Sequence, residues 1–407
     1  MTTAPVVAQP TVSAESNVVS RRFLSIDVFR GLCVAGMILV TNPGSYSYDY
    51  WPLRHADWNG ATPTDMIFPS FLFLAGVSMR FSFAKRMRLG ESSARIGCHI
   101  LVRSVLLIVL GVALNCFDLL TLPNLRLPGV LQRIGLCYFL GGFLYLALSG
   151  RRAALRIGGV AGAVLALLTL YWLLQTQAPV PGYGAGRLDQ EGNFGAYIDR
   201  AVFGIQHLWH WGGQMWDPEG LLSTLPATCN LLLGILAGEW LNRTGFVQDF
   251  RSRLRVLGMA LFGVVLALVA LELNYTIPIN KKIWTPSFML LSGGFSLMGL
   301  GLLHWMLEGR LEGRNDRRWR WAVTPALVFG SNAILGFSLA NAMSPLLGKL
   351  RLPTPDGSFG APSVYIFQHL LPWMSPWNAS LAYALIFVVM NAAILWPLYR
   401  RRIFLRL

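Results

Sequence analysis

Apolar residues occur along the chain in long runs that are separated by short polar or basic stretches. A helix needs about 20 predominantly apolar residues to cross the hydrocarbon layer of a bilayer. Ten runs approach or reach that length, so the pattern predicts ten transmembrane helices. Their expected ranges are 27–42, 64–84, 98–117, 128–149, 153–174, 221–241, 253–274, 285–307, 321–345 and 379–399.

Two other segments have a different character. The run from Pro362 to Trp373 is apolar but short and contains prolines, so we expect a partial or interfacial segment. Residues 1–20 are polar and lack the apolar stretch of a secretory signal peptide. We therefore expect a disordered tail over 1–20 and one transmembrane domain over 21–407.

The composition supports this interpretation. Hydrophobic residues make up 54% of the 407 residues, charged residues make up 13%, and the mean hydropathy is +0.50. A soluble domain carries about 25% charged residues. The chain has too few charges to cover a water-facing surface, which excludes a cytosolic globular enzyme. The predicted fold class is all-α, a polytopic membrane bundle of about ten transmembrane helices.

The net charge of +15 reflects where the 34 Lys and Arg residues lie. One alternate set of connections between the predicted spans holds 22 of them, the other holds 8, and the rest lie within spans. Cytoplasmic connections carry an excess of Lys and Arg. Both termini are therefore expected on the cytoplasmic side, and the positive charge requires no nucleic acid as a partner.

No metal site is expected from the sequence. The five cysteines lie within or at the ends of apolar runs and have no metal-binding spacing. His207 and His210 are close enough to share a helical face, but no third ligand stands at a fixed spacing from them. An aromatic segment at the membrane surface explains this part of the chain better.

The first connection concentrates polar groups between two spans. It contains Asn42, His55, Asp57 and Asp65 within 24 residues. Asp65 can cap the second helix by accepting its free N–H groups, or it can serve chemistry together with His55. His55 itself is either a solvated loop histidine or a functional group, and the local pattern alone leaves both interpretations open.

Arginines within the predicted spans are the second signal. Arg30, Arg80 and Arg103 lie towards cytoplasmic ends, where long side chains can reach the interface. Arg133 differs, because it follows Gln132 near the outer end of its span and is expected to face the bundle interior. Such buried polar groups either join helices to one another or line a polar cavity.

Several blocks of residues together resemble the heparan-α-glucosaminide N-acetyltransferase family. The blocks are Ser25-Ile26-Asp27-Val28-Phe29-Arg30-Gly31, Asn42-Pro43-Gly44, His55-Ala56-Asp57-Trp58-Asn59-Gly60, Thr64-Asp65-Met66-Ile67-Phe68-Pro69, Leu127-Pro128-Gly129-Val130-Leu131-Gln132-Arg133-Ile134, Asp217-Pro218-Glu219-Gly220-Leu221-Leu222-Ser223-Thr224 and Ile279-Asn280-Lys281-Lys282-Ile283-Trp284-Thr285-Pro286-Ser287-Phe288. The chain is similar to the bacterial members associated with amino-sugar use. It lacks the large N-terminal domain of the animal lysosomal enzyme, so we expect a bacterial inner membrane rather than a lysosome.

The resemblance implies transfer of an acetyl group from cytosolic acetyl-CoA to the amine of glucosamine or a related amino sugar on the far side of the membrane. It places the active-site histidine at His55 and a nearby functional asparagine at Asn42. An imidazole suits removal of a proton from an attacking amine. His55 could instead carry the acetyl group transiently, and direct transfer is favoured.

The other candidate residues follow from chemical type and position. Asp65 or Asp57 would orient the imidazole, while Asn42 or Arg133 would donate to the developing oxyanion. The candidates for binding acetyl-CoA are Arg30, Arg103, Gln132, Arg133, Ser331 and Asn332. The candidates for binding the acceptor sugar are Asp57, Trp58, Asn59 and Lys282.

Two other functions compete with the acetyltransferase. One is an amino-sugar transporter that uses the same polar cavity, and the other is a non-catalytic membrane scaffold. A transporter is expected to contain discontinuous helices or internal repeats, whereas this chain gathers ionisable groups on one short connection. The sequence leaves the oligomeric state open, with a homodimer among the arrangements that it allows.

Overall fold

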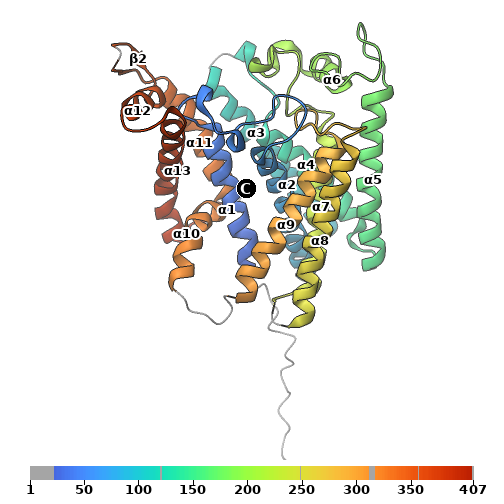
Figure 1. The fold of residues 1–407 in the computed structure, drawn as a ribbon. Coiled ribbons are helices and arrows are strands. Elements are labelled where there is room, and N and C mark those ends of the chain that lie inside the picture. The colour runs from blue at the N-terminus through green and yellow to red at the C-terminus, as the bar shows by residue number, and fades with distance from the viewer. Residues whose placement is uncertain (1–22, 120–121, 248, 311–316, 356, 406–407) are drawn as a thin grey trace, which may run out of the picture.

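The computed structural model describes residues 23–119, 122–247, 249–310, 317–355 and 357–405. In this part of the chain, nine helices are long and apolar enough to cross a membrane. These helices are α1 (Leu24–Thr41), α2 (Ile67–Arg88, preceded by the 3₁₀ turn Pro63–Met66), α3 (Ser93–Leu119), α4 (Val130–Ser149), α5 (Ala153–Gln177), α7 (Thr224–Thr244), α8 (Phe250–Leu273), α9 (Pro286–Arg310) and α13 (Pro376–Arg400). They run side by side (Figure 1), which confirms the predicted polytopic helical bundle. The predicted tail over 1–20 lies outside the described residues.

The segment expected as one span over 321–345 is broken. It forms α10 (Arg317–Ser331) and α11 (Ala333–Gly348), and the two helices meet at 77°. Asn332 stands between them with a non-helical backbone, and its side chain bonds the chain end instead. Its Nδ2 donates to the Ile403 carbonyl (3.0 Å), and its Oδ1 accepts from the Leu405 N–H (2.8 Å). Hydropathy does not report such a tertiary contact, so the sequence did not predict the break. The bent pair counts as the tenth span if its two helices together cross the membrane.

Short elements cover one end of the bundle (Figure 1). They are α6 (Phe194–Phe203), α12 (Pro362–Leu370) and an antiparallel pair, β1 (Leu352–Pro353) with β2 (Phe359–Gly360). The Asn193 side chain caps α6 by accepting from the Ala196 N–H at 2.8 Å. α12 has 9 residues, which agrees with the expected short segment after Pro362.

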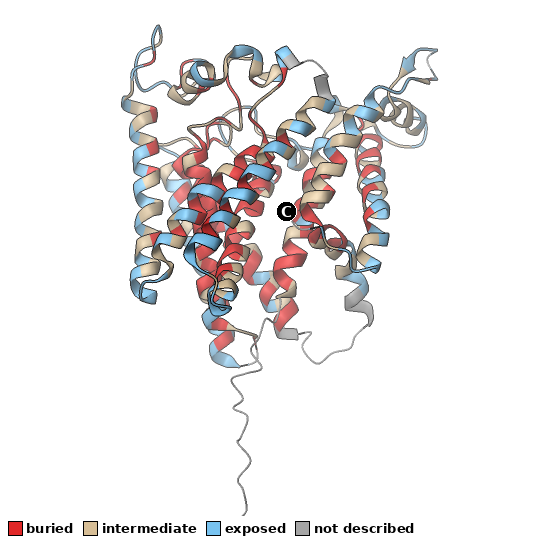
Figure 2. Ribbon diagram, turned by 180° about the vertical axis from the view of Figure 1, so that it is seen from behind, coloured by how far each residue is buried: buried red, intermediate tan, exposed pale blue. Residues whose placement is uncertain are grey.

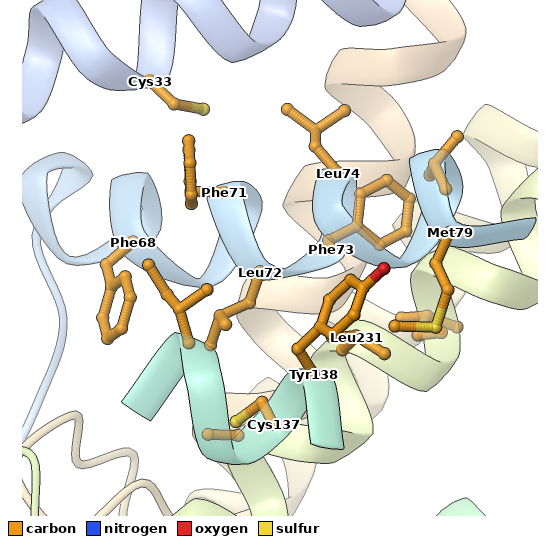
Figure 3. Packing of buried hydrophobic residues seen from close by; sticks show 14 of the residues in the cluster. Cys33, Phe68, Phe71, Leu72, Phe73, Leu74, Met79, Cys137, Tyr138 and Leu231 are labelled. Carbon is orange, nitrogen blue, oxygen red and sulfur yellow. The ribbon is translucent and has the colours of Figure 1, made fainter. Parts of the chain in front are cut away.

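The core lies around α2 and α7, while α5 lies at the periphery (Figures 1 and 2). In the most apolar 18-residue stretch of each helix, 83% of α7 and 72% of α2 are buried, against 17% of α5. Glycines bring α2 and α7 into backbone contact, since a Cβ on Gly234 would lie 1.9 Å from the Phe73 carbonyl oxygen. Figure 3 places Phe71 of α2 towards Cys33 of α1, and Tyr138 of α4 beside α2. Small residues at such contacts are typical of membrane helix packing.

Polar contacts also join the buried helices. Asn230 of α7 donates to Ser292 Oγ at 3.1 Å and accepts from Trp284 Nε1 at 3.0 Å. Near the opposite end of α7, Glu239 pairs with Arg80 (2.7 Å) and Arg156 (2.8 Å). Arg80 is thereby held by a carboxylate inside the bundle, as a buried cation requires.

Candidate active site

The connection between α1 and α2 is held in a folded-back conformation by hydrogen bonds to the Asp65 carboxylate. Asp65 Oδ2 accepts the Thr62 N–H (2.9 Å), the Thr62 hydroxyl (3.1 Å) and the Ala56 N–H (3.2 Å). The carboxylate therefore does cap the turn that begins α2. This leaves its second oxygen, Oδ1, free of the cap and directed towards His55.

His55 and Asp65 form a direct pair. His55 Nδ1 lies 2.7 Å from Asp65 Oδ1, with 39% of the His55 side chain exposed and only 1% of the Asp65 side chain. A proton on Nδ1 that is donated to Oδ1 leaves the lone pair of Nε2 available to a substrate. Asp65 thus caps the turn with one carboxylate oxygen and contacts His55 with the other, while its catalytic role stays a prediction.

Lys281 also lies against the His55–Asp65 pair, although the sequence predicted only the neighbouring Lys282 as a site residue. Its Nζ lies 3.0 Å from His55 Nδ1 and 3.4 Å from Asp65 Oδ1, and 13% of its side chain is exposed. Both lysines lie in the block 279–288, from which the sequence predicted Lys282 as a contact of the acceptor sugar. The His55 imidazole and the Lys281 amine therefore both lie beside the same carboxylate oxygen, Asp65 Oδ1.

These neighbours perturb the titration of His55 and Lys281. Burial lowers the pKa of His55 below its usual 6.5, the charge on Lys281 lowers it further, and Asp65 opposes both. Burial likewise lowers the pKa of Lys281, again against Asp65. The imidazole is accordingly held in its neutral, basic form at pH 7.

The turn that carries Lys281 is tied to the His55 connection. The Gly60 N–H donates to the Ile279 carbonyl at 2.7 Å, and Asn280 Nδ2 donates to Asn59 Oδ1 at 3.1 Å. Asn59 therefore joins the two loops, and its expected contact with the acceptor stays a prediction. These two hydrogen bonds join segments that are more than 200 residues apart in the sequence.

Lys282 points to a different environment from Lys281. Its Nζ lies 5.3 Å from the centre of the Trp209 ring and 5.4 Å from that of Trp216. Trp58 packs edge-on against Trp216, with ring centres 5.1 Å apart, and its Nε1 donates to the Leu188 carbonyl. The indole rings therefore contact a lysine of the chain itself. Asp57, on the same connection, is exposed.

Ion pairs and arginine contacts stiffen the neighbouring loop 214–223. Arg126 binds both oxygens of Asp217 (2.7 and 2.9 Å) and Glu219 Oε2 (2.6 Å). Arg133, 1% exposed, donates to the Gly220 carbonyl and to Ser223, and its guanidinium lies over the Trp284 ring. Arg133 thus faces the bundle interior as predicted, close to the turn that carries the two lysines.

The structure does not bring Asn42 into a described bond with His55. Asn42 is buried at the end of α1, where its Nδ2 donates to the Ile38 carbonyl (2.9 Å) and to Thr41 Oγ1 (3.0 Å). Its amide N–H groups are therefore engaged by its own helix. The oxyanion role of Asn42 stays a prediction.

The residues expected to bind acetyl-CoA are spread over α1, α3, α4 and the break between α10 and α11. Arg30 pairs with Asp27 at 3.0 Å, and Arg103 lies over the Tyr138 ring at 4.7 Å. Gln132 Nε2 donates to the Leu127 carbonyl, and Ser331 Oγ donates to the Val328 carbonyl. Together with Arg133 and Asn332, described above, they stay predictions as a cofactor site.

Among the described residues, no group of three or more His, Cys, Asp or Glu side chains is arranged to hold a metal ion. His207 instead binds the Leu125 carbonyl through Nδ1 at 2.7 Å.

Comparison with known proteins gives a consistent set of relatives. Residues 22–273 match the family described as heparan-alpha-glucosaminide N-acetyltransferase, catalytic. Two curated relatives carry the name heparan-alpha-glucosaminide N-acetyltransferase. The human protein is 29% identical over 358 residues, which cover 77% of this chain and 52% of the relative. The mouse protein is 30% identical over 359 residues, which cover 78% of this chain and 53% of the relative. The chain thus aligns with about half the length of these relatives.

Proposed function

The chain belongs to the heparan-α-glucosaminide N-acetyltransferase family, and from that premise and the geometry around His55 we propose that it is a membrane-embedded N-acetyltransferase. The donor is acetyl-CoA and the acceptor is the amine of glucosamine or a related amino sugar. The names of the human and mouse relatives support both the reaction and the acceptor class. The His55–Asp65 pair is the single observation that carries the proposal to particular residues.

In the proposed reaction, His55 acts as the general base. The acceptor nitrogen forms a bond to the thioester carbonyl carbon, and the carbonyl electron pair moves to oxygen. Nε2 of His55 takes the proton that the nitrogen loses, while Asp65 Oδ1 stabilises the resulting imidazolium through Nδ1. The C–S bond then breaks, CoA leaves as the thiolate, and the imidazolium returns the proton to it.

Two donors are candidates in this proposal for the oxyanion of the intermediate, and Asn42 would first have to release its bonds to Ile38 and Thr41. Asn42 lies at the start of the connection that carries His55, and Arg133 has an Nε and an Nη1 that are buried without a described acceptor. Such a donor contributes about 3 kcal/mol when it is preorganised. We retain direct transfer over an acetyl-histidine intermediate, because the paired, neutral imidazole suits proton removal.

The proposed sidedness follows from the distribution of Lys and Arg. Acetyl-CoA enters from the cytoplasmic side, where Arg30 and Arg103 would meet its phosphates. Its thin arm would pass Ser331 and Asn332 towards His55, and this route requires the segment Ile403–Leu405 to leave Asn332. The acceptor is then bound on the outer side by Asp57, Trp58, Asn59 and Lys282. We place the protein in a bacterial inner membrane, with both termini cytoplasmic.

An amino-sugar transporter is the second candidate, and the break between α10 and α11 favours it. Discontinuous helices form substrate sites in many transporters. The transporter does not, however, require a histidine that is paired and directed by a capped carboxylate.

One experiment distinguishes the two functions. Purified protein in vesicles is supplied with acetyl-CoA outside and isotope-labelled glucosamine, and free and acetylated sugar are measured by mass spectrometry. The enzyme yields N-acetylglucosamine, and His55→Gln abolishes it while His369→Gln, an exposed histidine on α12, does not. Accumulation of unmodified glucosamine without product contradicts the proposal.

A further inference from the structure

Lys281 is not accounted for by the reaction as written above. Its Nζ lies 3.0 Å from His55 Nδ1, 3.5 Å from His55 Nε2 and 3.4 Å from Asp65 Oδ1. A lysine needed only for solubility would extend into water, yet this side chain is 13% exposed. Burying an ammonium is unfavourable unless a specific contact compensates it.

The conformation of the turn 279–285 places Lys281 in this position. Asn280 fixes the turn from within, since its Oδ1 accepts the Ile283 N–H at 3.1 Å and its carbonyl accepts the Thr285 N–H at 3.0 Å. Trp284 closes the turn at φ +55°, a left-handed conformation that a bulky residue rarely adopts. Strain of this kind persists where the surroundings fix it, and here Trp284 is buried and donates from Nε1 to Asn230 Oδ1.

Hydrogen-bond counting then restricts what His55 can do. Nδ1 can donate to Asp65 or accept from Lys281, but it cannot do both. Asp65 Oδ2 is occupied by Thr62 and Ala56, so Oδ1 alone serves the two bases. While the ammonium of Lys281 shares that oxygen, adding a proton to His55 places a second cation beside one carboxylate, and Asp65 stabilises the imidazolium less than it would without Lys281.

We propose that Lys281 is a positioning residue that keeps the His55 imidazole neutral and basic by sharing the one carboxylate oxygen that would otherwise stabilise an imidazolium. The inference rests on the proposed function, because it explains why the base is free when substrate arrives. The same positive charge disfavours the ammonium form of an acceptor amine at Nε2, so both reacting groups are neutral together.

The described charges with the largest effect on the pair come from three segments. Asp65 faces His55 from the start of α2, and Lys281 and Lys282 face it from the turn before α9. Glu219, on the loop 214–223, interacts with both lysines over a longer distance, and Asp57 interacts with Lys282. Removal of Lys281 therefore leaves Asp65 as the nearest charge, and the imidazolium of His55 no longer shares Asp65 Oδ1 with a lysine.

The test measures the titration of His55 directly and does not require activity. Protein with ¹⁵N-labelled histidine is titrated in detergent or nanodiscs, and the His55 signals are assigned by their absence in His55→Gln. Lys281→Met is expected to raise the pKa of His55 by about 1 unit, in line with the effect of a neighbouring charge. Lys281→Arg keeps the charge and is expected to leave that pKa unchanged.

Two further variants distinguish the effect of the Lys281 charge from an effect on folding. Lys85→Met removes an exposed lysine at the far end of α2 and should not move the titration. Lys281→Gln is a second neutral variant should the methionine variant fail to fold. An unchanged His55 pKa in folded Lys281→Met or Lys281→Gln overturns the inference, whether or not the protein acetylates glucosamine.

Activity provides an independent readout. In Lys281→Met the acid limb of kcat/KM should move to higher pH by the same amount, so that activity at low pH falls about tenfold relative to the plateau. A purely structural lysine would lower the plateau without moving the limb. Absence of acetyl transfer in the unmodified protein refutes the proposed function, while the titration still decides the role of Lys281.

Discussion

Substitution of Asp65 by Asn tests the geometry of the site most severely. Asp65 Oδ2 accepts from three donors of Thr62 and Ala56. An asparagine must place its carbonyl oxygen there, because an NH₂ group would face those donors. The NH₂ group then points to His55 Nδ1, which has to accept, and the ring proton moves to Nε2. Asp65→Asn therefore still caps the turn that begins α2, but Nε2 of His55 carries a proton and cannot accept one from the amine.

The magnitude follows from two losses. A hydrogen bond to a charged group contributes about 1.5–3 kcal/mol, and its loss corresponds to about 10- to 100-fold in rate. The unfavourable tautomer adds to this, and in the Ser-His-Asp hydrolases an equivalent change lowers kcat by about 10⁴-fold. We therefore expect kcat of Asp65→Asn to fall by at least about 100-fold, with KM for glucosamine much less affected.

The assay is the initial rate of N-acetylglucosamine formation by purified, folded protein at saturating acetyl-CoA. Asp189→Asn is the matched control, since Asp189 is a half-exposed carboxylate that pairs with Arg187 on an outer loop. Size-exclusion profile and thermal melting verify that both variants are folded. If Asp65→Asn keeps more than a third of the wild-type kcat, the tautomer argument is refuted.

The remaining predictions concern pH and packing. The acid limb of wild-type kcat/KM should lie below pH 6.5, because burial and Lys281 lower the pKa of His55 and the neutral form is active; a limb above pH 7 in a rate profile contradicts this. Glu239→Gln should destabilise the bundle by about 3 kcal/mol, visible in thermal melting, since it leaves the cations that Glu239 binds uncompensated. Gly234→Val should lower the melting temperature sharply, because any Cβ meets a carbonyl of α2, and an unchanged melting curve would disprove that packing. Burial raises the pKa of Asp199 from 3.8 to about 7. The folded protein is therefore progressively destabilised as the pH rises from about 4 to about 7, and Asp199→Asn should gain more thermal stability at pH 8 than at pH 5.

The sequence predicted the spans well because hydropathy reports length and apolarity directly. It predicted poorly where a tertiary contact decides the backbone, as at Asn332, whose amide bonds the chain end and interrupts a continuous apolar run. The short helix α12 could be anticipated, because its apolar run is too short to span and contains prolines.

The site was predicted in part for a related reason. His55 and Asp65 lie 10 residues apart on one connection, so the local sequence is enough to predict that they are neighbours. Lys281 reaches His55 from 226 residues further along the chain, and the contacts of Asn280 with Asn59 and of Ile279 with Gly60 explain the meeting. Lys282, which the sequence favoured, instead lies against the indole rings of Trp209 and Trp216.

The central claim is that His55 removes the proton from the acceptor amine. The most direct measurement is the rate of N-acetylglucosamine formation by purified His55→Ala, with and without added imidazole. The account predicts a rate below about 1% of wild type, as loss of a general base of 10²–10⁴-fold requires, and a partial recovery that rises with imidazole concentration. Wild-type rates in His55→Ala without imidazole would contradict it.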